Sequence, residues 1–419
     1  MRFLIAAPAS GSGKTTVTLG LLRAFAQDGQ TISGAKSGPD YIDPRFHEAA
    51  CGRPCFNLDA WAMSPQHIRA LAQSGPLIVE GAMGLFDGAP PDGKGACADL
   101  AVILNLPVVL VVDAGRMAQS IAPIVQGFAQ FKPDVQIAGV ILNNVGSLRH
   151  EQMLRGAMSK IGIPVFGVVM RNAALKMPSR HLGLVQAQER PDLDAFLDAA
   201  ADVVRQSVDL DALKQLGKPR AATPTQHNTP PPAQRIAIAQ DAAFAFSYPH
   251  LLRDWRSAGA EITFFSPLAD EAVPACDLVY LPGGYPELHA GRLASNTTFM
   301  QSLRNISEHT DVYGECGGYM TLGETLVDAD GVSHAMAGLL SLGTSFAARK
   351  LHLGYRDVSA TGGRFQGAWK AHEFHYATTL HADGTPLFTA SDATGTRLAD
   401  MGLRQGRVSG SFAHLIAPA

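Results

Sequence analysis

A glycine-rich turn near the start of the chain carries the residues with the clearest chemistry. Residues 8–16 read PASGSGKTT and stand between an apolar run, residues 3–7, and apolar residues at helical spacing. Glycines let backbone N–H groups curl around a phosphate, and the N-terminus of the following helix adds its positive dipole end. Lys14 can reach terminal phosphates, and the Thr15 hydroxyl can hold Mg²⁺. The predicted phosphate-binding residues are Ser10, Gly11, Ser12, Gly13, Lys14, Thr15 and Thr16.

One residue departs from the phosphate-loop pattern G-x-x-x-x-G-K-[ST]. Pro8 stands where the pattern has its first glycine. An ordinary strand–helix turn is therefore the alternative, but the flanking strand and helix have the order that a phosphate loop requires.

Three acidic residues follow predicted strands on the side of the sheet where the phosphate loop lies. Asp40 and Asp43 are in residues 36–44, KSGPDYIDP, which we expect to form a loop because of their prolines, glycine and aspartates. Glu80 ends the apolar run 77–79. Mg²⁺ prefers carboxylates together with phosphate oxygens, so we expect Thr15, Asp40, Asp43 and Glu80 to form its site. The alternative for Asp43, which precedes a proline, is a turn or a helix cap.

A second group of residues predicts a nucleophile. Residues 314–318 read GECGG between a short apolar strand and a helix, which is typical of the tight turn that exposes a nucleophilic side chain. The N–H of Gly317 can face an oxyanion, and His414 is the candidate base for Cys316. Taken alone, a cysteine is more often a small core residue, and this is the alternative for Cys316.

The remaining sequence positions these groups. Up to about residue 208, apolar runs at 31–35, 77–79, 107–112, 140–142 and 165–170 alternate with helical patterns, which predicts a parallel sheet covered on both faces. Residues 218–234 contain five prolines without apolar periodicity and read as a linker. We therefore expect domains at residues 1–217 and 235–419. The second begins with strands at 235–239, 261–265 and 278–281 and a helix at 248–258.

Composition excludes several classes of protein. The 419 residues are 46% hydrophobic and 17% charged, with a net charge of −3, so nothing favours nucleic acid or an anionic membrane as a partner. No apolar run approaches the roughly 20 residues of a membrane span. We expect a cytoplasmic protein, and its five cysteines, odd in number and irregularly spaced, do not suggest a disulfide framework.

The motifs, taken in order, resemble the cobyrinic or hydrogenobyrinic acid a,c-diamide synthase family. The matching segments span nearly the whole chain except the linker. The resemblance implies an α/β protein with a dethiobiotin-synthetase-like phosphate-loop domain, followed by a flavodoxin-like class I glutamine amidotransferase domain. The segments are APASGSGKTT, KSGPDYIDP, VEGAMGLFDG, PSRHLGL, LPGGYPE, YGECGGYM, HEFHY and SFAHL.

The resemblance also implies roles in the second domain. Cys316 would attack the side-chain amide of glutamine, His414 would be the general base, and Gly284 and Gly317 would offer oxyanion N–H groups. Amidotransferases of this type usually carry H-x-E, in which the glutamate orients the histidine, but residue 416 is Ile416. The third member would then come from elsewhere, with His372, Glu373 and His375 as candidates.

In the first domain, the resemblance implies that ATP activates a carboxylate as an acyl phosphate, which ammonia then attacks. Mg²⁺ is the implied cofactor. The partners are a corrinoid, glutamine and ATP, and a homodimer is left open. Asn143 or Asn144 matches the position that reads adenine. The residues expected near substrate are Tyr41, Ile42, Asp87, Arg180 and His181.

The predicted function is amidation of the a- and c-side-chain carboxylates of hydrogenobyrinate or cobyrinate in cobalamin biosynthesis. Another tetrapyrrole, such as nickel sirohydrochlorin, is an alternative substrate. A partition-type ATPase switch is the alternative from a different class. Such switches carry a signature lysine at the position of Ser10 and lack the cysteine-elbow domain.

Overall fold

The computed structural model describes residues 1–72, 75–172, 175, 179–180, 183–184, 186–218 and 229–419. The contacts between residues divide the chain into two compact units, Met1–Gln226 and His227–Ala419. His181 lies outside the described residues. None of the described helices is both long enough and apolar enough to cross a membrane.

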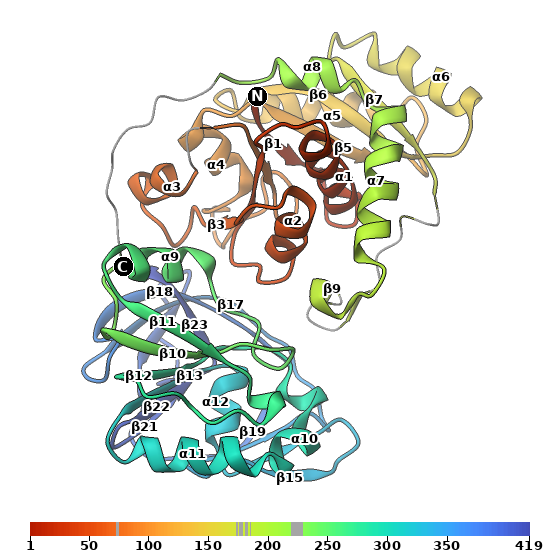
Figure 1. Ribbon diagram of the computed structural model, residues 1–419. Helices are drawn as coiled ribbons and strands as arrows, with labels where there is room; N and C mark the ends of the chain where they lie inside the picture. Colours follow the sequence, from red (N-terminus) through yellow and green to blue (C-terminus); the bar gives the residue numbers. More distant parts are fainter. Residues whose placement is uncertain (73–74, 173–174, 176–178, 181–182, 185, 219–228) are drawn as a thin grey trace. The chain divides into compact units, whose positions relative to one another are not determined.

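The first unit is built on a seven-stranded sheet in which every neighbouring pair is parallel (Figure 1). This confirms the parallel sheet predicted from the alternation of apolar strands and helices. In sheet order, the strands are β3 (Phe56–Leu58), β2 (Ser33–Ser37), β4 (Leu77–Glu80), β1 (Arg2–Ala6), β5 (Val108–Asp113), β6 (Ile137–Val145) and β7 (Val165–Met170).

Helices flank this sheet on both faces (Figure 1). Helices α1, α2 and α7 pack against one another, as do α3 with α4 and α5 with α6. Their bounds are α1 (Lys14–Gln27), α2 (Asp43–Cys51), α3 (Pro65–Leu71), α4 (Cys97–Leu104), α5 (Ile121–Phe131), α6 (Leu148–Met158), α7 (Leu193–Ser207) and α8 (Leu210–Lys214), with the short elements β8 (Ser179–Arg180), β9 (Gly183–Leu184) and η2 (Ala187–Glu189).

Two expectations about this unit need correction. Residues 36–44 are not all loop, because Lys36 and Ser37 end β2, where a strand was expected at 31–35. In addition, α2 begins at Asp43, with Pro44 in its first turn, where proline loses no helical hydrogen bond. The strand predicted at residues 140–142 is longer than expected, so that Asn143 and Asn144 lie inside β6, where its pairing with β7 shifts register. Asn144 has a φ of 58°, a backbone conformation that asparagine tolerates better than most residues. Asn143 still pairs with Asp113 of β5, so the shift at these two residues is in the pairing of β6 with β7.

The second unit contains a six-stranded sheet whose first five strands are parallel. In chain order, these five strands lie as 2-1-3-4-5, which is the flavodoxin-like arrangement. The predicted strands 235–239, 261–265 and 278–281 are confirmed at these bounds. In sheet order, the strands are β11 (Glu261–Phe265), β10 (Arg235–Ala239), β12 (Leu278–Leu281), β13 (Asp311–Glu315), β22 (Val408–Ser411) and the antiparallel β21 (Leu403–Gln405).

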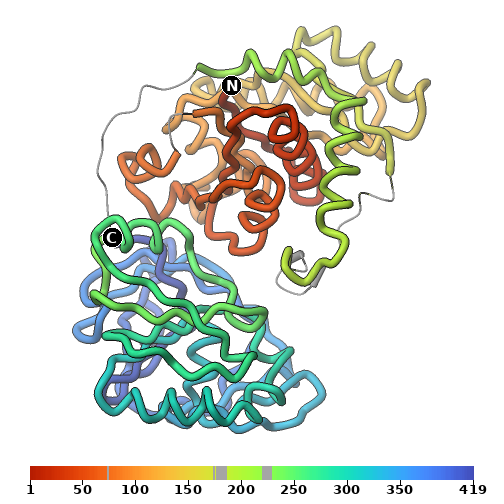
Figure 2. The backbone as a smooth tube through the Cα atoms, viewed as in Figure 1, coloured from red at the N-terminus to blue at the C-terminus, as the bar shows by residue number. Residues whose placement is uncertain are grey.

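Two smaller four-stranded sheets and a set of helices complete this unit. Figure 2 follows the chain through the unit, from green at β10 to blue at the C-terminus. One small sheet holds β15 (Ser333–Ala335), β14 (Thr325–Val327), β16 (Ser341–Ser345) and β19 (Thr378–Asp383). The other holds β20 (Thr389–Asp392), β17 (His352–Ala360), β18 (Gly367–His375) and β23 (Ala413–Pro418). The helices are α9 (Pro249–Ser257), α10 (Ala290–Ser295), α11 (Thr297–Ser307) and α12 (Gly317–Leu322), with η3 (Pro267–Ala269) and η4 (Pro286–Leu288).

Candidate active sites

The phosphate loop joins the carboxyl end of β1 to the first turn of α1. Gly11 and Gly13 have φ values of 79° and 89°, which L-amino acids with side chains rarely adopt. Gly13 is the N-cap of α1, so Lys14 and Thr15 begin the helix. The Lys14 ammonium donates a hydrogen bond to the carbonyl oxygen of Met83, 2.6 Å away. The loop therefore has the backbone that a phosphate cradle requires.

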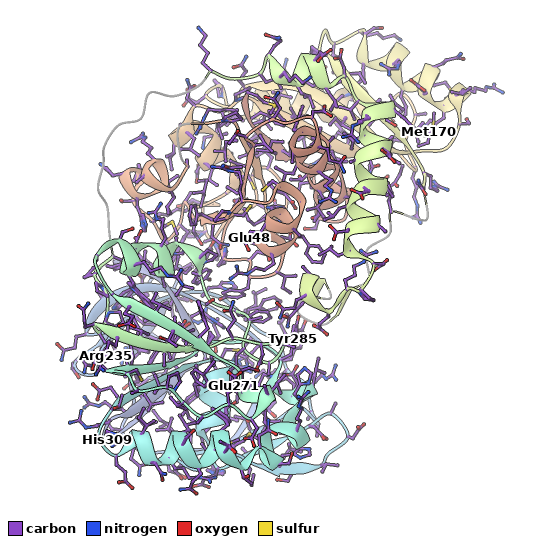
Figure 3. All side chains as sticks on the ribbon, in the orientation of Figure 1. Glu48, Met170, Arg235, Glu271, Tyr285 and His309 are labelled. Carbon is purple, nitrogen blue, oxygen red and sulfur yellow. The ribbon has the colours of Figure 1, made fainter. Side chains whose placement is uncertain are left out.

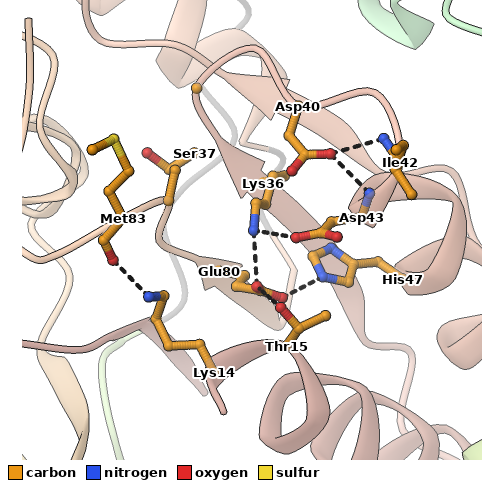
Figure 4. A network of polar contacts seen from close by, with 12 residues as sticks. Lys14, Thr15, Lys36, Ser37, Asp40, Ile42, Asp43, His47, Glu80 and Met83 are labelled. Carbon is orange, nitrogen blue, oxygen red and sulfur yellow. Dashed lines mark hydrogen bonds and ion pairs between the residues drawn. The ribbon is translucent and has the colours of Figure 1, made fainter. Parts of the chain in front are cut away.

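Glu80, at the end of β4, is the centre of a buried polar network (Figure 4). The Thr15 hydroxyl donates to Glu80 Oε1 at 2.6 Å, and Lys36 Nζ donates to the same oxygen at 2.8 Å. His47 Nε2 lies 2.7 Å from Glu80 Oε2. Lys36 also contacts Asp43. Three of the four predicted metal ligands therefore belong to one network.

The fourth predicted ligand, Asp40, is adjacent to this network in the chain. Its Oδ1 accepts hydrogen bonds from the backbone N–H groups of Ile42 and Asp43 at 2.8 and 2.9 Å. This fixes the turn into α2 and brings a second aspartate beside Asp43. Carboxylates and a threonine hydroxyl are hard oxygen donors of the kind that Mg²⁺ prefers, so the donor set fits this ion.

Charges within the network set its ionisation. Burial alone would raise the pKa of Glu80, but the Lys36 charge and the His47 hydrogen bond outweigh burial and lower it. For Asp43, burial and the neighbouring Asp40 outweigh Lys36 and raise its pKa to about 6. The Lys36 pKa is raised because the three carboxylates outweigh its burial. Glu80 is thus held as an anion beside a cation.

Lys36 and His47 were missed by the sequence analysis. Lys36 lies within β2, a fully buried strand, and a charged residue in such a position is a sign of function. His47 is a single histidine on α2, and no spacing in the sequence connects it with Glu80.

A cavity of about 410 Å³ adjoins the phosphate loop. Asn143 donates a hydrogen bond to the backbone oxygen of Ser12 at 2.9 Å, so it is also part of the loop's support. The apolar side chains of Val169 and Val204 form another part of the wall. Of the predicted ATP-binding residues, Gly11, Gly13, Thr16, Asn143 and Asn144 line this cavity.

Of the residues expected near substrate, the structure describes the side chains of Tyr41, Ile42 and Asp87. The side chains of Tyr41 and Ile42 are only 9% and 6% exposed, since they pack where the chain enters α2. Asp87 is exposed, and its Oδ2 accepts a hydrogen bond from the Gly84 backbone, which stabilises a turn. Arg180 lies in the short strand β8.

Cys316 occupies the sharp turn between β13 and α12. Its φ of 46° and ψ of −100° are strained for a residue with a side chain, as the nucleophile-elbow pattern predicts. A Cβ on Gly318 would lie 1.9 Å from the Leu281 carbonyl oxygen, so the turn requires glycine there. Figure 3 labels Tyr285, a fully buried residue in the segment after β12, whose ring contacts that of Phe246.

The side chains of Cys316 and His414 both lie beside Gly283. A Cβ placed on Gly283 would lie 3.0 Å from His414 Nε2 and 3.3 Å from Cys316 Cβ, so all three residues adjoin the same point. A Cβ on Gly317 would lie 3.0 Å from the Gly284 backbone nitrogen. The structure thus brings together all four residues predicted for the glutaminase site.

Burial, followed by the charge of Glu287, raises the pKa of the Cys316 thiol well above its ordinary value. The thiol is therefore protonated at neutral pH, and a nearby base is needed to form the thiolate.

A carboxylate lies beside the other nitrogen of His414. Glu315 Oε2 is 3.5 Å from His414 Nδ1, and both side chains are buried. The acids and histidines considered from the sequence are arranged differently: Glu373 pairs with Arg356 at 2.7 Å and with His375 at 3.0 Å. His372 is the register partner of His414 on the neighbouring strand. Glu315 was missed because no motif connects it with a histidine one hundred residues away.

Comparison with known proteins agrees with this division into two sites. Residues 3–185 match the CobQ/CobB/MinD/ParA nucleotide binding domain, and residues 235–419 match the CobB/CobQ-like glutamine amidotransferase domain. A solved structure titled as a glutamine amidotransferase aligns at 17% identity over 38% of this chain and 80% of that chain, with a TM-score of 0.29, too low to bear on the fold.

Curated relatives match the whole chain. A hydrogenobyrinate a,c-diamide synthase from Brucella abortus biovar 1 (strain 9-941) is 56% identical, over 99% of this chain and 98% of the relative. One from Rhodobacter capsulatus is 51% identical, with the same coverage of both chains. The chain belongs to the hydrogenobyrinate a,c-diamide synthase family.

Proposed function

We propose that this protein amidates the a- and c-side-chain carboxylates of hydrogenobyrinate, using ATP, Mg²⁺ and glutamine. The observation that supports the proposal is that one chain brings together two separate groups of the predicted residues. Thr15 contacts Glu80 beside the phosphate loop, and Cys316 and His414 meet at Gly283. The relatives' names supply the substrate.

In the first unit, the phosphate loop and Lys14 bind the ATP phosphates, and the cavity beside Asn143 and Asn144 takes the base. Thr15, Asp40, Asp43 and Glu80 would hold Mg²⁺, which supplies positive charge against the phosphate oxygens. A substrate carboxylate oxygen attacks the γ-phosphorus and ADP leaves. The carboxylate thereby gains a leaving group, which ammonia displaces to give the amide and phosphate.

In the second unit, His414 Nε2 takes the Cys316 proton and the sulfur attacks the side-chain amide carbon of glutamine. The oxyanion is held by the N–H groups of Gly284 and Gly317. The carbon–nitrogen bond then breaks, and the leaving nitrogen takes the proton from His414 to become ammonia. Water hydrolyses the thioester, which returns the thiol and releases glutamate.

The test is to supply glutamine whose side-chain nitrogen is a heavy isotope, with ATP and Mg²⁺, and to count heavy amides on the macrocycle by mass spectrometry. Hydrogenobyrinate is expected to gain two. Cobyrinate and nickel sirohydrochlorin are offered separately, and a preference for either one would replace the proposed substrate. ATP hydrolysis without amidation of any macrocycle would favour the ATPase-switch alternative.

Cys316→Ala is expected to lose glutamine-dependent amidation but to keep amidation with concentrated ammonium salt, since ammonia then bypasses the glutaminase. We propose that the enzyme acts in the cytoplasm. A homodimer is the hypothesis for its assembly, which analytical ultracentrifugation of the purified protein tests.

A further inference from the structure

We propose that Glu315 is the positioning acid of the glutaminase site and does for His414 what the missing glutamate of an H-x-E motif would do. The inference rests on the proposed function of Cys316 and His414. The two nitrogens of the His414 ring face different groups. Nδ1 lies 3.5 Å from Glu315 Oε2, and Nε2 faces the point beside Gly283 that Cys316 also adjoins.

The Glu315 carboxylate is itself held by three donors. Tyr280 donates its hydroxyl to Oε2 at 2.7 Å, while Tyr313 donates to Oε1 at 3.2 Å. The backbone N–H of Leu415, the residue after His414, also donates to Oε1 at 3.1 Å. Together these three hydrogen bonds fix the orientation of the carboxylate. Burial and the Glu315 charge raise the pKa of both tyrosines, so that both keep their protons and remain donors.

The fold explains why the acid comes from the strand before the nucleophile. Side chains alternate along β13, so Tyr313 and Glu315 share one face of the sheet and Cys316 follows directly. The Leu415 N–H ties this face to the strand that carries His414. Ile416, where H-x-E would place its acid, is fully buried and accepts a hydrogen bond at its carbonyl from His250. An acid at residue 416 is therefore not needed for a complete triad.

The carboxylate has a defined chemical effect. It accepts a hydrogen bond from the N–H at Nδ1, which leaves the lone pair of Nε2 directed toward the thiol. Once Nε2 has taken the Cys316 proton, the negative carboxylate stabilises the imidazolium. The 3.5 Å separation is at the outer limit of a hydrogen bond and is expected to shorten as the ring becomes charged.

Glu315→Gln is the sharpest test because the surrounding donors fix the orientation of the new amide. The Leu415 N–H and the Tyr313 hydroxyl both favour the amide oxygen at the Oε1 position. The amide NH₂ then occupies the Oε2 position, donates to His414 Nδ1 and forces the proton onto Nε2. We expect kcat for glutamine-dependent amidation to fall by about 10²- to 10⁴-fold, with KM for glutamine nearly unchanged. Ammonia-dependent amidation should remain at the wild-type rate.

Tyr280→Phe is the matched control, since it removes a hydrogen bond to the same carboxylate oxygen without changing the tautomer of His414. We expect it to lower glutamine-dependent kcat by less than tenfold. A Glu315→Gln variant that is no slower than Tyr280→Phe would overturn the proposal.

A double-mutant cycle distinguishes positioning from a purely structural role. If Glu315 acts through His414, then Glu315→Gln should have no further effect on glutamine hydrolysis in a His414→Ala background. Additive losses would overturn the proposal. If Glu315→Gln does not fold, Glu315→Asp replaces it, and an unchanged kcat in that variant would overturn the proposal equally. Ammonia-dependent amidation by the wild type tests the proposed function by itself. The ratio of the glutamine-dependent rate to the ammonia-dependent rate in the Glu315 variant tests the role of Glu315.

Discussion

Lys36 Nζ lies 2.8 Å from Glu80 Oε1, although both side chains are almost entirely buried. A buried ion pair of this kind costs desolvation energy, so its presence beside a phosphate loop indicates a role in binding charge and not in stability alone. With Thr15 and His47 also in contact, Glu80 is the residue through which the first site is organised.

Glu80→Gln should therefore remove ATP-dependent amidation while affecting nucleotide affinity much less. The amide cannot supply the negative charge that faces Mg²⁺, whereas Lys14 and the loop N–H groups still hold phosphate. We expect kcat with ammonia to fall by about 10²-fold or more, and glutamine hydrolysis to persist. Steady-state kinetics and ATP titration measure the two effects. Glu151→Gln is the control, because Glu151 lies in α6 and pairs with Arg155, and near wild-type turnover of the Glu80 variant would remove Glu80 from the metal site.

Gly13→Ala should weaken nucleotide binding severely. Its Cβ would lie 2.1 Å from the Asn143 side-chain nitrogen, at a φ of 89°. Gly29→Ala is the matched control, because Gly29 has a φ of 77° with nothing within 4 Å. The control should lose roughly 1–2 kcal/mol of stability from the backbone alone. Calorimetric titration with ATP compares the variants, and equal affinities would mean that the loop tolerates a displaced Asn143.

The features that could be predicted from the sequence are those that depend on residues close together in the chain. The phosphate loop, the cysteine elbow and most strands of both parallel sheets are local patterns of apolar spacing and glycine. β3, with only three residues, was too short to produce such a pattern. The bulge at Asn144 was not predicted because it arises from register with a neighbouring strand.

The polar pairs that complete both sites were not predictable in the same way. Lys36 and Glu80 meet because β2 and β4 are neighbours in the sheet, although β3 and α3 separate them in the chain. Glu315 and His414 meet only after β13 and β22 pair. Such contacts depend on the order of the strands in the sheet. A single sequence shows only that strands and helices alternate, and many strand orders are compatible with that alternation.

The Cys316 thiol should react slowly with iodoacetamide at neutral pH when no substrate is present. Burial raises its pKa above the ordinary value of 9.0, so the thiolate fraction, and with it the alkylation rate, should still be increasing at pH 9. Cys51 provides an internal comparison, since a hydrogen bond with Cys55 lowers its pKa to about 6. Peptide mass spectrometry separates the two sites. A rate at Cys316 that reaches its plateau below pH 8 would contradict the neutral resting thiol.

Gly283→Ala should separate the two half-reactions without replacing either catalytic residue. The added Cβ would lie 2.3 Å from His414 Cε1, so the imidazole must move away from Cys316. General-base assistance is typically worth about 10²- to 10⁴-fold, and we expect a loss of glutamine-dependent kcat in that range. Ammonia-dependent amidation should be unchanged, because the phosphate loop belongs to the other unit.

Gly291→Ala is the control for this variant, since its Cβ would make an ordinary contact of 3.4 Å with His334 Cε1 in the same unit. It should leave both activities close to wild type. If Gly283→Ala also keeps its glutamine-dependent rate, then His414 can act from a displaced position, and its placement beside Gly283 is not what activates the thiol. If the variant loses both activities and unfolds at lower temperature than the control, the close approach at Gly283 serves folding of the second unit instead.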